Sequence, residues 1–351
     1  MKALVKTGPE PEQLELQLDR EPVALPESGH VRVAVAACGI CGTDLHIIEG
    51  GYSSRPPVTL GHEVSGTVVE VSGDVDAGWI GAPVALETFF RTCRECDYCR
   101  SGRPNMCGNR ISIGSGADGG FAESIVVPVA NLHRLPEGIP VTAGALSEPL
   151  ACVCQSLFDP SPAVTPGDRV LVVGPGAVGL LAAQVARACG GEVAVSGTPK
   201  DGVRLALAKQ LGFAAVVTPS STDDLPEGWG DGPDVVIECS GSGPGMESGL
   251  RLIRKRGRYV QMGQTDRNVQ VPLALVSFKE LTITGGFAST PASWRRAFQL
   301  LASGAIDFAS LVTHELPLER WREAFDATAN GEGVKYLLTP SADTHVEGDT
   351  Q

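Results

Sequence analysis

The sequence predicts an α/β protein with a barrel-like β-rich domain and a second domain built on a doubly wound parallel sheet. Short apolar segments between glycine and proline turns fill the first part of the chain, whereas strand and helix patterns alternate after residue 162. A length of 351 residues also suits two domains of roughly 150 residues each. We place one domain at residues 1–157 and 292–351 and the other at residues 158–291.

Apolar segments flanked by turns predict the strands of both domains. Those of the first domain lie at residues 31–36, 64–71 and 81–86. Those of the second lie at residues 169–173, 192–196, 214–218, 234–238, 258–262 and 281–284. Helices predicted at residues 177–189 and 203–211 separate the first three of these, an order that is typical of parallel sheets with right-handed crossovers.

The C-terminal part of the chain contains one more clear helix and one more strand. Thr290 and Pro291 are a typical N-cap and first helical residue, and the helix that follows should end before Gly304. Its buried face comprises Trp294, Phe298 and Leu301. The last strand is predicted at residues 335–339, and the polar residues 341–351 are expected to fray because they have little to bury.

The charge and the apolar segments of the chain argue against some classes of binding partner and cellular location. Lys and Arg number 28 against 41 Asp and Glu, which gives a net charge of −13 and argues against nucleic acid or an anionic membrane as partner. The longest uncharged apolar segment, residues 170–186, is interrupted by glycines and short for a membrane span, and the first residues lack the apolar core of a signal peptide. We therefore expect a cytoplasmic protein with ten reduced cysteines.

Four of these cysteines, Cys93, Cys96, Cys99 and Cys107, lie within one polar loop. Thiolates at this spacing can converge on one tetrahedral zinc ion, and four sulfur ligands leave no position for a substrate. The loop therefore predicts a structural zinc site. A redox role for Cys96 and Cys99 is disfavoured because the strand-to-helix context of such motifs is absent, and a nucleic-acid zinc finger is disfavoured by the acidic charge.

Other zinc-binding side chains are dispersed along the chain. Cys41 and His46 lie in one segment, His62 and Glu63 in a second, and Glu148 in a third. Each is weak evidence alone, because a single buried cysteine or histidine is more often part of a core. Together they offer a thiolate, imidazoles and carboxylates, and such a mixed set can leave one coordination position open, as a catalytic zinc requires.

Residues 174–179 read GPGAVG, which matches the G-x-G-x-x-G fingerprint of Rossmann dinucleotide-binding domains. The match follows a predicted strand and opens a predicted helix, the context in which backbone N–H groups contact a pyrophosphate. The expected cofactor contacts are Gly174, Gly176, Ala177, Val178 and Gly179.

The second predicted strand of this domain lacks the terminal acid that usually binds the ribose of NAD. Ser196 and Thr198 stand there, followed by the cations Lys200 and Arg204. Absence of the carboxylate removes repulsion of a 2′-phosphate, so these four residues are expected cofactor contacts and NADP is favoured over NAD. Asp201 is close enough in sequence to contact the ribose instead.

Several motifs, taken together, resemble the zinc-dependent medium-chain dehydrogenase/reductase family, which includes the alcohol dehydrogenases, over nearly the whole chain. They are residues 39–46 (GICGTDLH), 61–63 (GHE), 119–123 (GGFAE), 148–150 (EPL) and 174–179, with the four-cysteine loop between the second and third. Glu148 followed by Pro149 resembles the sorbitol and threonine dehydrogenase branch. The resemblance implies a GroES-like catalytic domain, a Rossmann domain, and hydride transfer between a secondary alcohol and NAD(P).

The resemblance also implies roles for individual residues. Cys41, His62 and Glu148 would coordinate the catalytic zinc, and Glu63 would be a nearby or exchanging ligand. Thr43 and His46 match the proton relay of the family. The rival ligands Cys152 and Cys154 follow Glu148 closely.

Substrate and assembly are less defined by the sequence. An oxygen ligand in place of a thiolate favours a polyol or sugar substrate, and the expected pocket walls are Phe89, Phe121 and Phe287. A threonine-like amino alcohol and a simple secondary alcohol are the alternative substrates. A zinc-free quinone or enoyl reductase, a non-enzymatic zinc-storing protein and a hydrolytic zinc enzyme are the alternative classes. The resemblance suggests a homo-oligomer, either a dimer or a tetramer.

Overall fold

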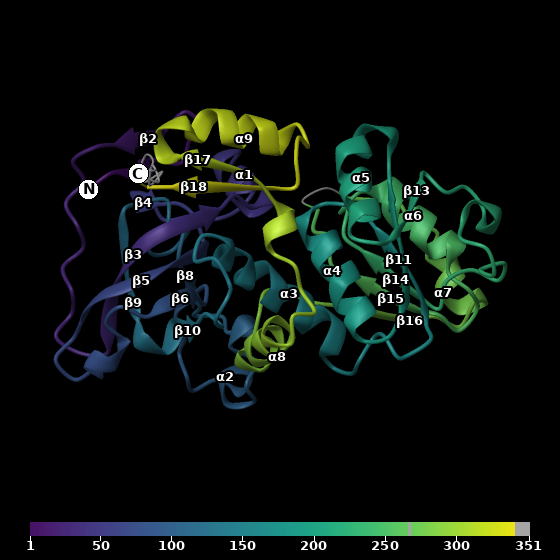
Figure 1. Cartoon of the computed structure of the whole chain (residues 1–351), viewed down its shortest axis with the longest axis horizontal. Helices are drawn as coiled ribbons and strands as arrows, with labels where there is room; N and C mark the ends of the chain where they lie inside the picture. The colour runs from purple at the N-terminus through teal and green to yellow at the C-terminus, as the bar shows by residue number, and fades with distance from the viewer. Residues whose placement is uncertain (266–267, 341–351) are drawn as a thin grey trace, which may run out of the picture.

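Two groups of elements lie side by side in the computed structural model, which describes residues 1–265 and 268–340 (Figure 1). The N-terminal strands and the last elements of the chain form one group, and the elements between them, coloured teal to green, form the other. The pairing of the last strand with β3 supports the assignment of C-terminal residues to the first domain. The domain boundaries themselves stay a prediction, and the tail at residues 341–351 lies outside the described residues.

The first group contains the predicted barrel-like β structure. Its seven-stranded sheet has the order β10-β6-β5-β3-β18-β17, and β9 also pairs with β3. A three-stranded sheet, β2-β1-β4, contributes to the same apolar core. The strands of these two sheets are β1 (Ala3–Lys6), β2 (Leu14–Gln17), β3 (His30–Gly39), β4 (Val58–Thr59), β5 (Glu63–Val71), β6 (Pro83–Leu86), β9 (Ser124–Pro128), β10 (Leu132–Arg134), β17 (Val312–Pro317) and β18 (Lys335–Thr339).

The second group is a parallel six-stranded sheet of order β13-β12-β11-β14-β15-β16. Its strands are β11 (Arg169–Val173), β12 (Glu192–Gly197), β13 (Ala214–Val217), β14 (Val235–Glu238), β15 (Arg258–Gln261) and β16 (Thr282–Gly285). Val170 and Val172 of β11 belong to one apolar cluster, and Leu171 and Val173 belong to another. Because successive side chains point to opposite faces, both faces of this sheet are covered, which confirms the doubly wound architecture.

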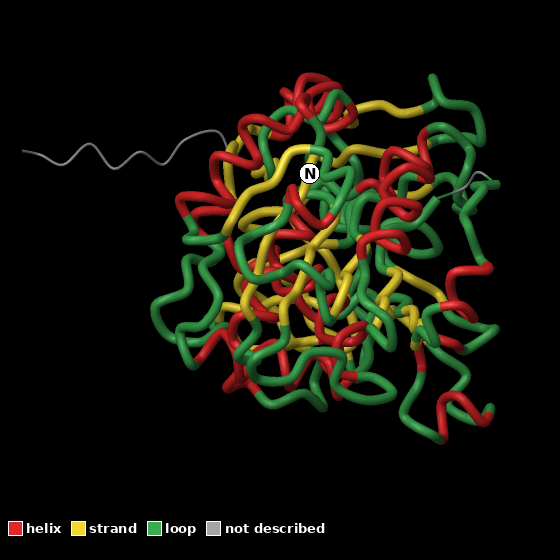
Figure 2. The backbone as a smooth tube through the Cα atoms, turned by 90° about the vertical axis from the view of Figure 1, so that its right-hand side faces the viewer, coloured by secondary structure: helices red, strands yellow, loops and turns green. Residues whose placement is uncertain are grey.

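Helices surround the strands when the molecule is seen from the side of this sheet (Figure 2). Two of them, α4 (Ala177–Ala188) and α5 (Gly202–Gln210), match the predicted helices closely. The sequence patterns did not single out α3 (Ser147–Phe158), α6 (Gly243–Leu252), α7 (Ala274–Phe278) or α9 (Trp321–Ala329). None of the helices in residues 1–265 and 268–340 has the length and apolar character needed to cross a bilayer.

The predicted C-terminal helix is α8 (Pro291–Ala302), which packs against α3. Its N-cap is Thr290, whose hydroxyl accepts a hydrogen bond from the Ser293 N–H at 3.3 Å, as expected from the sequence. Trp294 and Leu301 are buried as predicted, and Phe298 is half-buried against the same cluster.

Candidate functional site

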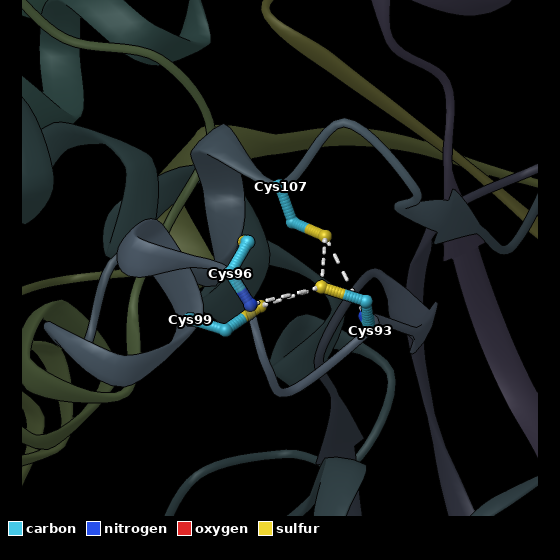
Figure 3. A group of neighbouring side chains, drawn as sticks. All are labelled: Cys93, Cys96, Cys99 and Cys107. Carbon is cyan, nitrogen blue, oxygen red and sulfur yellow. Dashed lines mark hydrogen bonds between the residues drawn. The ribbon is translucent and has the colours of Figure 1, made fainter.

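The four-cysteine loop folds back on itself around the short helix α2 (Asp97–Arg100). Its four sulfur atoms lie within 4.8 Å of one another, and Cys93 stands between Cys99 and Cys107, at 3.9 and 3.6 Å (Figure 3). Backbone hydrogen bonds in the loop, from Glu95 and Cys96, lower the pKa of Cys93 to about 6. Four convergent sulfurs, one of them a stabilised thiolate, fit a tetrahedral zinc ion.

A cavity of about 280 Å³ lies where the two groups of elements meet. Cys41, His62 and Glu148 line it from the first group, and Val178 and Met262 line it from the second. The structure thus brings the three predicted ligands to one space, which Val178 of the glycine-rich motif and Met262 after β15 also line.

Cys41 and His62 reach this cavity from the ends of two paired strands. β3 ends at Gly39, and Cys41 is the N-cap of α1 (Gly42–Ile48). His62 directly precedes β5, and the turn before it requires Gly61, which has a φ of +91°. A Cβ atom there would lie 2.6 Å from the sulfur of Cys38, so only glycine allows this approach.

Asp44, to which the sequence reasoning gave no role, contacts both Cys41 and His62. Its Oδ2 accepts a hydrogen bond from the Cys41 N–H at 2.9 Å, and its Oδ1 lies 3.5 Å from His62 Nδ1. Asp44 is fully buried, and Oδ1 has no hydrogen-bond partner in the described part of the chain. Burial opposes the charge on His62, but the Asp44 and Cys41 charges raise the pKa of the imidazole well above its usual value.

This arrangement fits a metal ion. A carboxylate that faces Nδ1 orients the ring and leaves Nε2 to bind a metal, as in the carboxylate–histidine–zinc triads of many proteins. Metal and proton compete for Nε2, so a metal ion would replace the Nε2 proton while Nδ1–H keeps facing Asp44. The signal in the sequence was the position of Asp44, three residues after the N-cap Cys41.

Glu63 lies within 4.8 Å of Cys41 and His62, but it is held by a second buried residue, Lys335. The Lys335 Nζ contacts both Glu63 oxygens, at 2.9 and 2.7 Å, and donates to the Ile40 carbonyl at 2.9 Å. Burial opposes the charge on Lys335, yet Glu63 raises the pKa of the amine. Glu63 is therefore a paired carboxylate at the edge of the site.

Replacing Lys335 with methionine should destabilise the fold strongly, because it leaves the buried Glu63 charge without a partner. We expect the free energy of unfolding, measured by denaturant titration, to fall by about 3–5 kcal/mol. The double variant Lys335→Met/Glu63→Gln should recover most of that loss, because both charges are then gone. A single variant within about 1 kcal/mol of the parent protein would show that the pair is not buried as described.

Glu148 lies in the first turn of α3 and faces the same cavity, although it is outside the group formed by Cys41, His62 and Glu63. Its Oε1 accepts hydrogen bonds from the Thr88 hydroxyl at 2.9 Å and the Cys152 thiol at 3.3 Å.

Of the two rival zinc ligands, Cys152 lies at the cavity and Cys154 does not. Burial raises the pKa of the Cys152 thiol well above its usual value, and Cys152 lines the cavity beside Glu148. Cys154 belongs to the apolar core, where burial raises the pKa of its thiol to about 12.

Five further side chains were predicted near the catalytic site or its pocket, and all but one of them line the cavity. Thr43 and His46 line it, as do the aromatic residues Phe89 and Phe287. The prediction for Phe121 was wrong: this ring is 1% exposed and packs on Phe325 in the core, with centroids 5.7 Å apart. The Phe121 ring lies against the turn before His62, where a Cβ at residue 61 would collide with it.

The glycine-rich turn has the geometry that a dinucleotide requires. Gly174 has a φ of +100°, and a Cβ at Gly179 would lie 1.9 Å from the Gly174 carbonyl oxygen. A Cβ at Gly176 would meet nothing within 4 Å, so the N-terminus of α4 is open to an approaching pyrophosphate. Val178, in the first turn of α4, reaches the main cavity, whereas Ala177 lies beside Gly176.

In the loop that follows β12, the Asp201 carboxylate accepts hydrogen bonds from a residue of the same loop. Its Oδ2 accepts hydrogen bonds from the Thr198 N–H at 2.9 Å and the Thr198 hydroxyl at 2.8 Å. Arg204 lies 3.5 Å from Oδ1 and donates through Nε to the Gly333 carbonyl. Ser196 is buried and donates to a neighbouring strand, whereas Lys200 is exposed.

Two family models match the chain. The alcohol dehydrogenase GroES-like domain matches residues 27–137, and the zinc-binding dehydrogenase domain matches residues 177–303. These segments cover most of the β-rich group and most of the parallel sheet.

Individual proteins match along almost the whole length. A sorbitol dehydrogenase of Halalkalibacterium halodurans is 39% identical over 97% of this chain and 99% of its own length. A D-arabitol-phosphate dehydrogenase of Enterococcus avium is 36% identical over 88% and 89%. Among solved structures, a zinc-binding dehydrogenase from Sinorhizobium meliloti bound to NADP has a TM-score of 0.85 at 33% identity, covering 97% and 99% of the two chains.

Proposed function

The chain belongs to the zinc-binding dehydrogenases that carry an alcohol dehydrogenase GroES-like domain, and on this premise we propose that it oxidises a secondary alcohol of a polyol with NAD(P). The observation that carries the proposal is the shared cavity: zinc-binding side chains line one wall, and Val178 and Met262, from the side of the glycine-rich turn, line the other. A zinc-free quinone or enoyl reductase or a hydrolase would not need both features.

We assign Cys41, His62 and Glu148 as the residues that hold the catalytic zinc. Glu63 is the less suitable carboxylate because Lys335 contacts both of its oxygens. Glu148 is held by the neutral donors Thr88 and Cys152, so its charge is free to stabilise a cation. The four cysteines of the loop would hold a separate structural ion.

When bound, a zinc ion held by Cys41, His62 and Glu148 would supply Lewis acidity to the substrate hydroxyl, and a nicotinamide would supply the hydride acceptor. The hydroxyl proton must leave by another route, and Thr43 and His46 provide it. They are three residues apart on α1 and therefore share one face of the helix, which lines the cavity. His46 Nδ1 is buried without a hydrogen-bond partner in the described residues, so it is available to accept that proton.

For the cofactor, we propose a preference for NADP. Both oxygens of Asp201 are engaged, by Thr198 and by Arg204, so this carboxylate does not replace the acid that binds the ribose of NAD. The exposed Lys200 ammonium then remains for a 2′-phosphate.

A parallel screen of zinc-loaded protein tests the function. Polyols, sugars and threonine are offered with NAD and with NADP, and the absorbance of the reduced nicotinamide is followed. We expect oxidation of polyols with a higher kcat/KM for NADP than for NAD. Oxidation of threonine alone would favour the amino-alcohol alternative, and no oxidation of any alcohol by zinc-loaded, cofactor-binding protein would contradict the proposal.

We also propose that the chain forms a homodimer through the edge of its parallel sheet. β16 is the last strand of that sheet, and its Ile283 is 41% exposed. Just before it in the chain, Leu273 and Phe278 at the two ends of α7 are 67% and 78% exposed. An unpaired, apolar strand edge is a template for pairing with a second copy of itself. A cytoplasmic location, finally, suits the ten cysteines, none of which forms a disulfide.

Ile283→Lys should convert this dimer to monomers, because two copies of the charge would meet at a two-fold contact. Light scattering coupled to gel filtration gives the mass in solution. Val217, which is 55% exposed on the opposite sheet edge β13, provides the matched control. An unchanged mass for Ile283→Lys, or equal dissociation by Val217→Lys, would rule out the β16 interface.

A further inference from the structure

One cation in the cavity plays no part in the chemistry described so far. Arg110 precedes β8 (Ile111–Ser112), which pairs with β7 (Phe89–Arg91), and it lines the same cavity as Cys41 and His62. Among the described lining residues it is the single lysine or arginine. From its surroundings we propose that Arg110 binds an anionic group, a phosphate or a carboxylate, on the substrate, and so selects charged polyols over neutral ones.

The guanidinium of Arg110 is fixed by three contacts, with Phe287, Phe89 and Asn105. Its Cζ lies 4.8 Å from the ring centroid of Phe287 and 5.4 Å from that of Phe89. Its Nη1 donates to the Asn105 carbonyl at 2.5 Å, and the Asn105 side chain donates to the Phe287 carbonyl at 2.8 Å. The cation is thus held in one orientation before any ligand arrives, which lowers the entropic cost of binding.

Within residues 1–265 and 268–340, no carboxylate forms an ion pair with Arg110. The two acidic residues that line the cavity have other partners: Lys335 holds Glu63, and Thr88 holds Glu148. An arginine keeps its charge, and a half-buried charge normally has a counter-ion. A ligand anion is therefore the partner that this site lacks.

The donors that remain free on the Arg110 guanidinium also suit a phosphate or a carboxylate. With Nη1 engaged by Asn105, Nε and Nη2 remain as neighbouring donors, the pair that binds two oxygens of a phosphate or carboxylate. A neutral hydroxyl would use one of these donors and leave the charge unbalanced. The anion would sit at the Phe89 and Phe287 side of the cavity while another carbon of the same substrate faces Cys41 and His62.

This inference rests on the proposed function, and Arg110→Met tests it. Methionine keeps the apolar contact with both rings but removes the charge and the donors. The zinc-loaded protein is assayed with arabitol, arabitol phosphate and arabinonate, and binding of each is measured by titration calorimetry. Arg134→Met is the matched control, because Arg134 lies 4.2 Å over the Trp79 ring and is not among the cavity-lining residues.

We expect the parent protein to favour one of the two anions over arabitol by at least about tenfold in kcat/KM. Arg110→Met should weaken use of that anion by roughly 10–100-fold, mainly through KM, the range for a hydrogen bond to a charged group. Oxidation of arabitol should stay within about threefold, and Arg134→Met should match the parent. The preferred anion, ester or acid, identifies the source of the charge.

Two results would overturn the inference: equal loss with arabitol and with the anions, or a parent protein that oxidises arabitol and binds neither anion. The proposed function fails separately. If Arg110-dependent binding of arabitol phosphate or arabinonate is seen without oxidation of any alcohol, the anion site stands and the dehydrogenase assignment does not.

Discussion

Cys41→Ser is expected to abolish turnover while leaving the fold and cofactor binding intact. The serine hydroxyl is a far weaker zinc ligand than a thiolate, and loss of the ion removes Lewis-acid stabilisation of about 4 kcal/mol, or roughly a thousandfold in rate. Cys41 is half-buried at the cavity wall and is not part of an apolar core cluster, so the substitution costs little packing. The measurements are kcat, zinc content and NADP affinity of the purified variant.

Cys189→Ser is the matched control, because Cys189 ends α4 outside both zinc-binding groups. It should keep full activity and the zinc content of the parent. In Cys41→Ser, one of the two candidate sites should lose its ion while NADP still binds. Retention of most activity by Cys41→Ser would show that Cys41 does not hold a catalytic ion.

The second large effect is expected from Cys99→Ala in the four-cysteine loop. Structural zinc couples directly to folding, and the polar loop has no apolar core to replace it. We expect the free energy of unfolding to fall by about 4 kcal/mol or more, which lowers the melting temperature by roughly 10 °C. The loop also carries Asn105, the contact of Arg110 and Phe287, so loosening it should raise KM for the substrate.

The melting temperature is compared with and without a zinc chelator. Chelation should lower it for the parent protein and much less for Cys99→Ala. A variant that melts within about 1 °C of the parent, in zinc-containing buffer, would argue against a structural ion in this loop.

Local patterns predicted the parallel sheet well because each strand there is a continuous apolar run between turn residues. β11 to β16 all fall within one or two residues of the predicted limits. The helix α9 shows apolar residues at helical spacing, Trp321, Ala324 and Phe325, which the sequence reasoning passed over. The helix α3 was missed for a different reason, because it is buried almost all round. In α3 even Ser147 and Gln155 are buried, so no polar face marks the helix in the sequence.

The candidate site was predictable where ligands cluster or follow a turn motif. The four cysteines, Cys41 and His62 lie as expected. The pair of Glu63 and Lys335 was not predictable, since 272 residues separate its partners and β18 must first join β3. The position of Phe121 was not predictable either. Its residue type is the same as that of Phe89, but its side chain is buried in the core. Such contacts depend on tertiary placement.

The assignment of an open zinc centre to Cys41, His62 and Glu148 is tested most directly by anomalous diffraction at the zinc edge from crystals of the zinc-loaded protein. We predict one peak among the four loop sulfurs and a second in the cavity. The cavity peak should lie about 2.3 Å from Cys41 Sγ, 2.0–2.1 Å from a His62 nitrogen and 2.0–2.2 Å from a Glu148 oxygen. A cavity peak bound to Glu63 in place of Glu148, or the absence of a peak there in active crystals, would contradict it.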